Sequence, residues 1–108
     1  PKDRAEAHRM LATLSGRRHK VYTGVTVRSG ELELTGFEET DVEFCQLTPD
    51  EIERYIDTGE PLDKAGAYGI QEKGALLIRR IDGDYFNVVG LPLRRLRSML
   101  RGVGIELL

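Results

Sequence analysis

The strongest constraint on this fold is a run of alternating residues in the first half of the chain. Between Val21 and Arg28, apolar or β-branched residues occupy every second position, which is the period of a half-buried β-strand. Ser29-Gly30 is a turn signal, and the alternation resumes at 31–34 and again at 41–44, where acidic residues take one face. We therefore predict an antiparallel hairpin with one apolar face and one wet, acidic face.

Two helix starts flank this hairpin. Asp3 can cap a helix, and Glu6, three residues later, can complete a capping box. That helix is expected to end at Ser15-Gly16. The segment 48–51, Thr-Pro-Asp-Glu, is a stronger start because it combines a Thr cap, a proline at the first helical position and a glutamate that completes the box. We expect this second helix to close at Gly59.

The second half of the chain predicts two more strands and a last helix. Ala75–Ile81 and Tyr85–Val89 are joined by a turn signal, Asp82-Gly83. Both segments lack clean alternation, so we expect strands buried on both faces at the centre of a sheet. Pro92 opens a helix whose apolar face carries Leu93, Leu96, Leu100 and Val103. With no repeat or linker, the prediction is one mixed α/β domain over residues 1–108.

Composition places the chain among folded proteins and excludes some classes of function. Of its 108 residues, 40% are hydrophobic and 31% charged, as in ordinary globular domains. The net charge of -2 gives no basic field to attract nucleic acid. The single cysteine, Cys45, cannot form an internal disulfide and indicates a reducing compartment. No signal peptide or membrane-length apolar run is present, so we expect a soluble cytoplasmic protein without a membrane partner.

Two other features favour structure over function. Neither His8 nor His19 has a cysteine or second histidine at metal-ligand spacing, which argues against a zinc site. The last helix is basic, but its arginines flank the leucine stripe as an ordinary solvated face does, and no aromatic residues interleave with them to stack bases. These arginines are Arg94, Arg95, Arg97 and Arg101. We therefore expect no nucleic-acid partner.

The segment from Thr58 to Gln71 is the strongest candidate for a binding loop, because α/β proteins place such loops between helices and strands. Lys64 supplies a compact positive charge suited to a phosphate. Gln71 supplies an amide whose donor and acceptor match the adjacent N–H and C=O groups on the edge of uracil or thymine. The glycines that permit close approach of the backbone are Gly59, Gly66 and Gly69.

Two acidic residues of this segment leave two interpretations open. Glu60 and Asp63 have the oxygen ligands that a hard divalent cation prefers, and such a cation accompanies a polyphosphate. However, a loop of glycine, proline and charged residues is usually a solvated connection. In that case Lys64 and Asp63 would form an exposed ion pair of little energetic worth.

The segment from Thr58 to Gln71, TGEPLDKAGAYGIQ, closely resembles the hallmark segment of the Maf family of nucleotide pyrophosphatases. Other segments are similar to family motifs and occur in the family order. They are Leu14–Val25 (LSGR, His19 and VYTGV), Thr40–Phe44, Glu51–Ile56 and Asp84–Leu93 (DYFNVVGLPL). The resemblance covers essentially the whole chain.

This resemblance implies an enzyme that splits a nucleoside triphosphate into a monophosphate and pyrophosphate, using Mg²⁺ or Mn²⁺. It also implies a Maf/inosine-triphosphatase-like central sheet flanked by helices, and a protein that usually forms homodimers. The DKAGAYGIQ form is similar to the branch that acts on dTTP and UTP. By that likeness Gln71 falls on a position for base choice and Lys64 on the invariant lysine. The other residues assigned to the substrate pocket are Asp63, Gly66, Tyr68 and Gly69.

Two departures from the family pattern qualify that assignment. The family's Ser-x-Arg-Arg phosphate-binding segment and the Ala-Asp-Thr motif, which holds its general base, are not in this sequence, and the start at Pro1 resembles the point just after the family's Gly-Lys-Pro lysine. We therefore expect a carboxy-terminal part of the family domain, without catalytic residues of its own. Glu72 stands where the family usually has glycine, and its charge opposes an anionic substrate.

A second function from a different class remains open on the sequence. The family was first associated with septum formation, so the alternative is a non-catalytic nucleotide-binding or regulatory module linked to cell division. Pyrophosphate release would identify the enzyme. Saturable nucleotide binding without turnover would identify the module.

Overall fold

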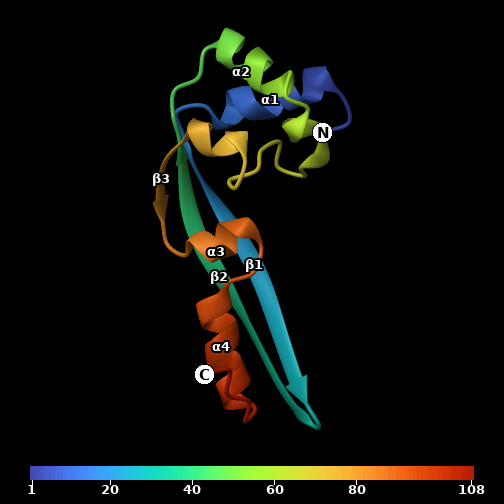
Figure 1. The fold of residues 1–108 in the computed structure, drawn as a ribbon, viewed down its shortest axis with the longest axis vertical. Helices are drawn as coiled ribbons and strands as arrows, with labels where there is room; N and C mark the ends of the chain where they lie inside the picture. Colours follow the sequence, from blue (N-terminus) through green and yellow to red (C-terminus); the bar gives the residue numbers. More distant parts are fainter. The chain divides into compact units, whose positions relative to one another are not determined.

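The computed structural model describes residues 1–108 and has a mixed α/β fold (Figure 1). A three-stranded sheet with strand order β1-β2-β3 is accompanied by helices, as the sequence predicts. The elements in chain order are α1 (Arg4–Leu14), β1 (Arg18–Ser29), β2 (Leu32–Phe44), α2 (Pro49–Ile56), the 3₁₀ helices η1 (Glu60–Asp63) and η2 (Lys73–Leu77), β3 (Ile78–Asp82), α3 (Tyr85–Val89) and α4 (Leu93–Gly102). None of the helices is long and apolar enough to cross a membrane.

The predicted hairpin is present as β1 and β2. Gly30 has φ +61° in the tight turn between them, a left-handed conformation that favours glycine. The strands are longer than predicted, since β2 runs continuously from Leu32 to Phe44. Basic side chains pair with the acidic ones, so the wet face has mixed charge. The pairs are Arg28–Glu33, Lys20–Glu39, Arg18–Asp41 and Arg79–Glu43.

Both predicted helix starts are confirmed. The Thr48 hydroxyl accepts from the backbone N–H of Glu51 at 3.1 Å, and the Glu51 carboxylate accepts from the backbone N–H of Thr48 at 2.8 Å, which completes the capping box. The Asp3 carboxylate accepts from the backbone N–H of Glu6 at 2.8 Å. However, Glu6 accepts from the backbone N–H of Lys2 instead of closing the box on Asp3. Each cap satisfies N–H groups that the first helical turn leaves unpaired.

The chain divides into two compact units. Unit 1 comprises residues 1–19 and 41–81, and unit 2 comprises residues 20–40 and 82–108. In unit 1, α1 packs against α2 (Figure 1). Its core combines buried side chains from both helices, from the end of β2 and from the segments that join β2 to α2 and α2 to β3. They are Ala7, Leu11, Val42, Phe44, Leu47, Ile52, Tyr55, Ile56, Ala67, Ile70 and Leu77.

Unit 2 has a smaller core between β1 and α4. Val27, Met99 and Val103 form its buried cluster, with partly buried side chains from the same two elements packed around them. The side-chain amide of Asn87 is fully buried and donates to the carbonyls of Val21 and Glu38, at 3.0 and 3.3 Å. This amide therefore ties α3 to both strands of the hairpin.

Of the two strand predictions in the second half, one is confirmed only in part and the other is wrong. Ala75–Ile81 was expected to be a central strand, but its first part lies in η2, and the strand itself begins at Ile78 and is an edge strand. Tyr85–Val89 is the helix α3, because Asp84 caps its N-terminus by accepting from the backbone N–H of Phe86 at 2.8 Å. The missing alternation therefore reflected short helical turns and not burial on both faces.

Candidate functional site

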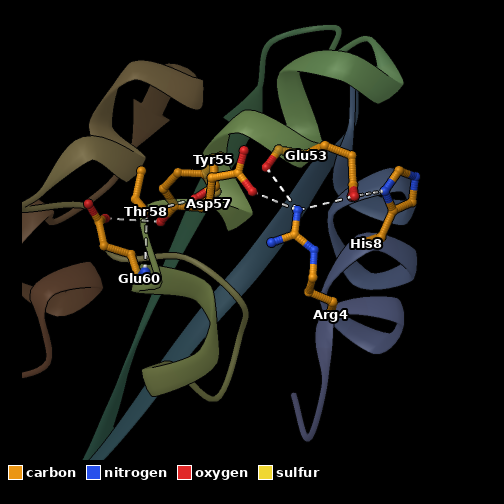
Figure 2. Close-up of polar contacts among 7 residues, drawn as sticks. All are labelled: Arg4, His8, Glu53, Tyr55, Asp57, Thr58 and Glu60. Atoms are coloured by element: carbon orange, nitrogen blue, oxygen red, sulfur yellow. Dashed lines mark hydrogen bonds and ion pairs between the residues drawn. The ribbon is translucent and has the colours of Figure 1, made fainter.

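The candidate binding loop runs from Thr58 to Gln71 within unit 1, and its start is fixed by the end of α2. The Thr58 hydroxyl donates to the carbonyl of Tyr55 at 2.6 Å and accepts from the backbone N–H of Glu60 at 3.2 Å (Figure 2). Gly59, between them, has φ +83°. Such a conformation strains residues that carry a Cβ, so the turn from α2 into η1 requires this glycine.

Glu60 closes the loop by holding its far end. Its carboxylate accepts from the backbone N–H groups of Lys73 and Gly74, at 3.1 and 3.2 Å, and from the hydroxyl of Tyr55 at 3.1 Å. The Tyr55 oxygen also accepts from the backbone N–H of Gly69 at 3.3 Å. Burial raises the pKa of Tyr55 to about 12, so at neutral pH the phenol keeps the proton that it donates to Glu60.

These contacts bear on the cation hypothesis for Glu60 and Asp63. The Glu60 carboxylate is occupied by backbone N–H groups and a phenol, whereas Asp63 is exposed at the end of η1. No group of three or more His, Cys, Asp or Glu side chains could hold a metal ion. Since Mg²⁺ and Ca²⁺ sites in proteins draw on several oxygen ligands, the residues of this chain do not form a metal centre by themselves.

Close approach requires glycine at position 74, in η2 just after the loop, whereas a side chain at position 69 would have to displace the flexible end of Lys64. A Cβ on Gly74 would lie 2.3 Å from the carbonyl oxygen of Gly69 and 2.8 Å from the hydroxyl of Tyr55. A Cβ on Gly69 would lie 2.8 Å from Cε of Lys64. By contrast, nothing lies within 4 Å of a Cβ on Gly66, so that position is open to the outside.

Lys64 lies along the loop and not out into solvent. Its ammonium donates to the carboxylate of Glu72 at 2.9 Å, and the hydrogen bond and charge of Glu72 raise its pKa. The expected exposed pair between Lys64 and Asp63 is not what forms, because Glu72 is the partner. The carboxylate of Glu72 thus already neutralises the positive charge of Lys64, to which a phosphate would bind.

Tyr68 and Gln71 point to different environments. Tyr68 is half-buried, with its hydroxyl 2.7 Å from Nε2 of His19 and its ring edge-to-face with Phe44 at a centroid distance of 4.8 Å. Gln71 is exposed, so both groups of its amide are open to a ligand. No spacing signal in the sequence relates His19 or Tyr55 to the loop, although both contact it in the structure.

An ionic network at the start of the loop joins α1 to α2 (Figure 2). Glu53 accepts from Nδ1 of His8 at 2.7 Å and from Arg4 at 3.2 Å, and Arg4 also pairs with Asp57 at 2.8 Å. The hydrogen bonds from His8 and Arg4 lower the pKa of Glu53. His8 is therefore a structural partner of Glu53.

A surface pocket of about 410 Å³ lies elsewhere in unit 1, beside α1 and the segment after β2. Its lining does not include any residue of the candidate loop. The lining residues are His8, Ala12, Ser15, Gly16, Arg17, Gln46, Leu47, Pro49 and Ile52. The loop chemistry predicted from the sequence therefore does not coincide with this hollow.

Comparison with known proteins gives a consistent picture. A family model described as Maf-like protein matches residues 1–103. A dTTP/UTP pyrophosphatase of Bacillus pumilus is 58% identical over 105 residues, which are 97% of this chain and 56% of that protein. Proteins of the same name from Bacillus cytotoxicus and Symbiobacterium thermophilum are 58% and 57% identical, over 94% and 96% of this chain and 53% and 54% of their own lengths. The chain thus spans about half the length of the curated relatives it matches.

Proposed function

The chain belongs to the Maf-like protein family, and on that premise we propose that its parent protein hydrolyses dTTP and UTP to the monophosphate and pyrophosphate. The observation that carries this proposal is 58% identity over 97% of the chain to a protein named dTTP/UTP pyrophosphatase. The reaction adds water to the α-phosphorus, breaks its bond to the oxygen bridging to the β-phosphate, and releases pyrophosphate and a proton. Residues 1–108 would be part of the single domain that performs it.

In this proposal the exposed amide of Gln71 recognises the base. Uracil and thymine present an imide N–H between two carbonyls, and one primary amide can pair with an adjacent donor and acceptor of that edge. The backbone of Gly66, Tyr68 and Gly69 would form the wall of the pocket, and Asp63 its rim. To bind the phosphates, the ammonium of Lys64 would give up its hydrogen bond to Glu72 and donate to a phosphate oxygen instead.

The chemical step needs more than this chain provides. Hydrolysis requires positive charge on the triphosphate and a base for the water, whereas Glu60 is engaged with backbone N–H groups and a phenol. We therefore assign to this chain binding and orientation of the base end of the nucleotide. A Mg²⁺ or Mn²⁺ ion, with its ligands and the general base, would belong to other parts of the parent protein.

Pyrophosphate release from a panel of nucleoside triphosphates with Mn²⁺ tests the function. The assay compares this chain with the product of its complete gene. Turnover of dTTP and UTP by the longer product supports the proposal. Saturable binding without turnover by both would favour the regulatory module linked to septum formation.

Gln71→Ala in the complete protein tests the proposed base recognition. We expect a loss of discrimination among bases with little change in the unfolding transition, because Gln71 is exposed. Gln46→Ala, which removes an exposed glutamine outside the loop, is the matched control and should retain the preference for dTTP and UTP. An unchanged nucleotide preference in Gln71→Ala would remove Gln71 from this role.

Two further proposals concern the setting of the protein. We infer a cytoplasmic location, since Cys45 has no second cysteine with which to form a disulfide in the chain. We also infer a homodimer, on the family likeness alone. Sedimentation of the complete protein over a range of concentrations measures this state directly.

A further inference from the structure

His19 ties the middle of the candidate loop to the sheet. It lies near the start of β1, and its Nε2 is 2.7 Å from the hydroxyl of Tyr68. The other fixed point of this part of the loop is the backbone N–H of Gly69, which donates to Tyr55 on α2. Adjacent loop residues are thus held by two different elements, Tyr68 by a strand and Gly69 by a helix.

Three rings enclose the hydrogen bond between His19 and Tyr68. The centroids of these two rings are 5.6 Å apart with an interplanar angle of 84°. Phe44, which is 1% exposed, lies edge-to-face with both, at 5.5 Å from His19 and 4.8 Å from Tyr68. Edge-to-face contacts of this kind are favourable beyond the area that they bury. Phe44 therefore fixes the planes of the two rings that share the hydrogen bond.

The direction of that hydrogen bond follows from the partners available. Burial raises the pKa of Tyr68 to about 12 and lowers the pKa of His19, so both are neutral at pH 7. Nδ1 of His19 is buried and has no partner. If Tyr68 donates to Nε2, only the hydrogen on Nδ1 lacks a partner. The reverse direction leaves both the phenol hydrogen and the Nδ1 lone pair unpaired, so the phenol is the donor.

We propose that His19 is a positioning residue for nucleotide binding, which holds Tyr68 and through it the backbone that leads to Gln71. This inference rests on the proposed function of the loop. His19 does not touch the nucleotide in this scheme. It accepts the Tyr68 hydroxyl and thereby fixes Gly66–Gly69, so that the amide of Gln71, two residues further on, meets the base in one orientation.

The proposal predicts which kinetic constant changes. Contacts to the base are the same in the bound substrate and in the transition state, because the bond that breaks lies in the triphosphate. Removing such uniform binding raises KM and leaves kcat unchanged. A purely structural role would instead lower the amount of active enzyme without changing KM for any nucleotide.

Tyr68→Phe in the complete protein is the first test, because it deletes only the hydroxyl and keeps the ring packed on Phe44. We expect KM for dTTP and UTP to rise about 3- to 10-fold at constant kcat, as for loss of one intramolecular hydrogen bond.

His19→Phe should give the same rise in KM, and the double variant should give no further rise. His19→Gln, which keeps an acceptor, should restore part of the affinity. An unchanged KM in Tyr68→Phe overturns the proposal while leaving the pyrophosphatase function intact.

Two readouts are independent of turnover. The ring nitrogens of His19 should show the hydrogen on Nδ1 and an unprotonated Nε2 by ¹⁵N NMR at pH 7, and a hydrogen on Nε2 would contradict the assigned donor. Backbone amides of residues 66–71 should exchange faster with solvent in Tyr68→Phe than in the parent. If the parent protein hydrolyses no nucleotide, the proposed function fails, and equal amide exchange would then overturn the positioning role as well.

Discussion

The two units differ in how they treat large apolar side chains. Unit 1 buries them around Phe44 and leaves only Leu62 and Leu76 strongly exposed. Unit 2 buries three apolar residues, which are Val27 of β1, Met99 of α4 and Val103 just after α4, and it carries all the other exposed large apolar side chains. Those are Tyr22, Leu32, Leu34, Phe37, Tyr85, Phe86, Val89, Leu91, Leu93, Ile105, Leu107 and Leu108.

The two units also differ in how each fixes a segment of chain, the candidate loop in unit 1 and α3 in unit 2. In unit 1, the candidate loop is fixed by contacts that begin and end within the unit, from Glu60 to the backbone of η2 and from Tyr68 to β1. In unit 2, two buried polar side chains, Asn87 and Thr40, tie α3 and its capping residue to the hairpin. We infer that the well-buried core of unit 1 keeps the candidate loop in one shape. In unit 2, the position of α3 depends more on a few polar contacts.

The largest expected effect is that of Phe44→Ala in unit 1. Phe44 is 1% exposed and contacts both His19 and Tyr68, so the substitution leaves a cavity and removes two ring contacts. The free energy of unfolding should fall by about 3–5 kcal/mol. Urea unfolding of the complete protein measures this loss. A loss below about 0.5 kcal/mol, the level of an ordinary surface substitution, would mean that Phe44 is not enclosed in the core of unit 1 as described.

Asn87→Ala should have the next largest effect and tests unit 2. The substitution leaves the carbonyls of Val21 and Glu38 and the hydroxyl of Thr40 without their buried donor. We expect a loss of about 1–3 kcal/mol in the free energy of unfolding. The native amide leaves its own Oδ1 unpaired, which limits the loss. Ser98→Ala, an exposed position on α4, is the matched control and should change the unfolding transition very little.

A smaller effect, confined to acid pH, is expected from Glu53 in unit 1. Hydrogen bonds from His8 and Arg4 lower its pKa in the folded state, so the folded protein binds this proton less readily than the unfolded chain does. The contribution of Glu53 to stability is therefore present at neutral pH. It is lost as the pH falls from the usual glutamate range through the lowered value.

Glu53→Gln should remove that part of the pH dependence. Unfolding measured from pH 7 down to acid pH should show a shallower loss of stability below about pH 4.5 than in the parent protein. Glu31→Gln, in the hairpin turn of unit 2, changes the net charge equally and makes none of these contacts, so its profile should follow the parent. Identical profiles for Glu53→Gln and Glu31→Gln would show that the network around Arg4 adds nothing to stability.

Local signals explain what the sequence could predict. Caps at Asp3 and Thr48 and the proline before α4 were read correctly because each acts within a few residues. The hairpin was predicted from a period of two and a turn glycine. The strand predicted at Tyr85–Val89 failed because Asp84 caps a short helix there, a signal as local as the others but outweighed by the apolar run.

The loop was predicted as a segment, but its internal contacts were not. For Glu60 the sequence leaves a cation ligand and a solvated loop residue both open, whereas its partners include backbone N–H groups 13 and 14 residues away. The contact of Tyr68 with His19 spans 49 residues of sequence. Contacts of that separation depend on how helix and strand pack, so no motif spacing reveals them. The choice of partner for Lys64 likewise depended on where the chain brings Glu72.

Phe37→Ala should have the smallest effect and is the matched partner of Phe44→Ala, since both residues lie on β2. Phe37 is 60% exposed, and its ring lies beside the ring of Tyr22 at 6.4 Å between centroids. Exposed substitutions of this kind usually change stability by less than about 0.5 kcal/mol. Urea unfolding of the two variants under one set of conditions compares the units directly. If Phe37→Ala lowered the free energy of unfolding nearly as much as Phe44→Ala does, the exposed face of unit 2 would be covered in the complete protein. The difference in exposed apolar side chains between the two units would then hold only for this chain taken by itself.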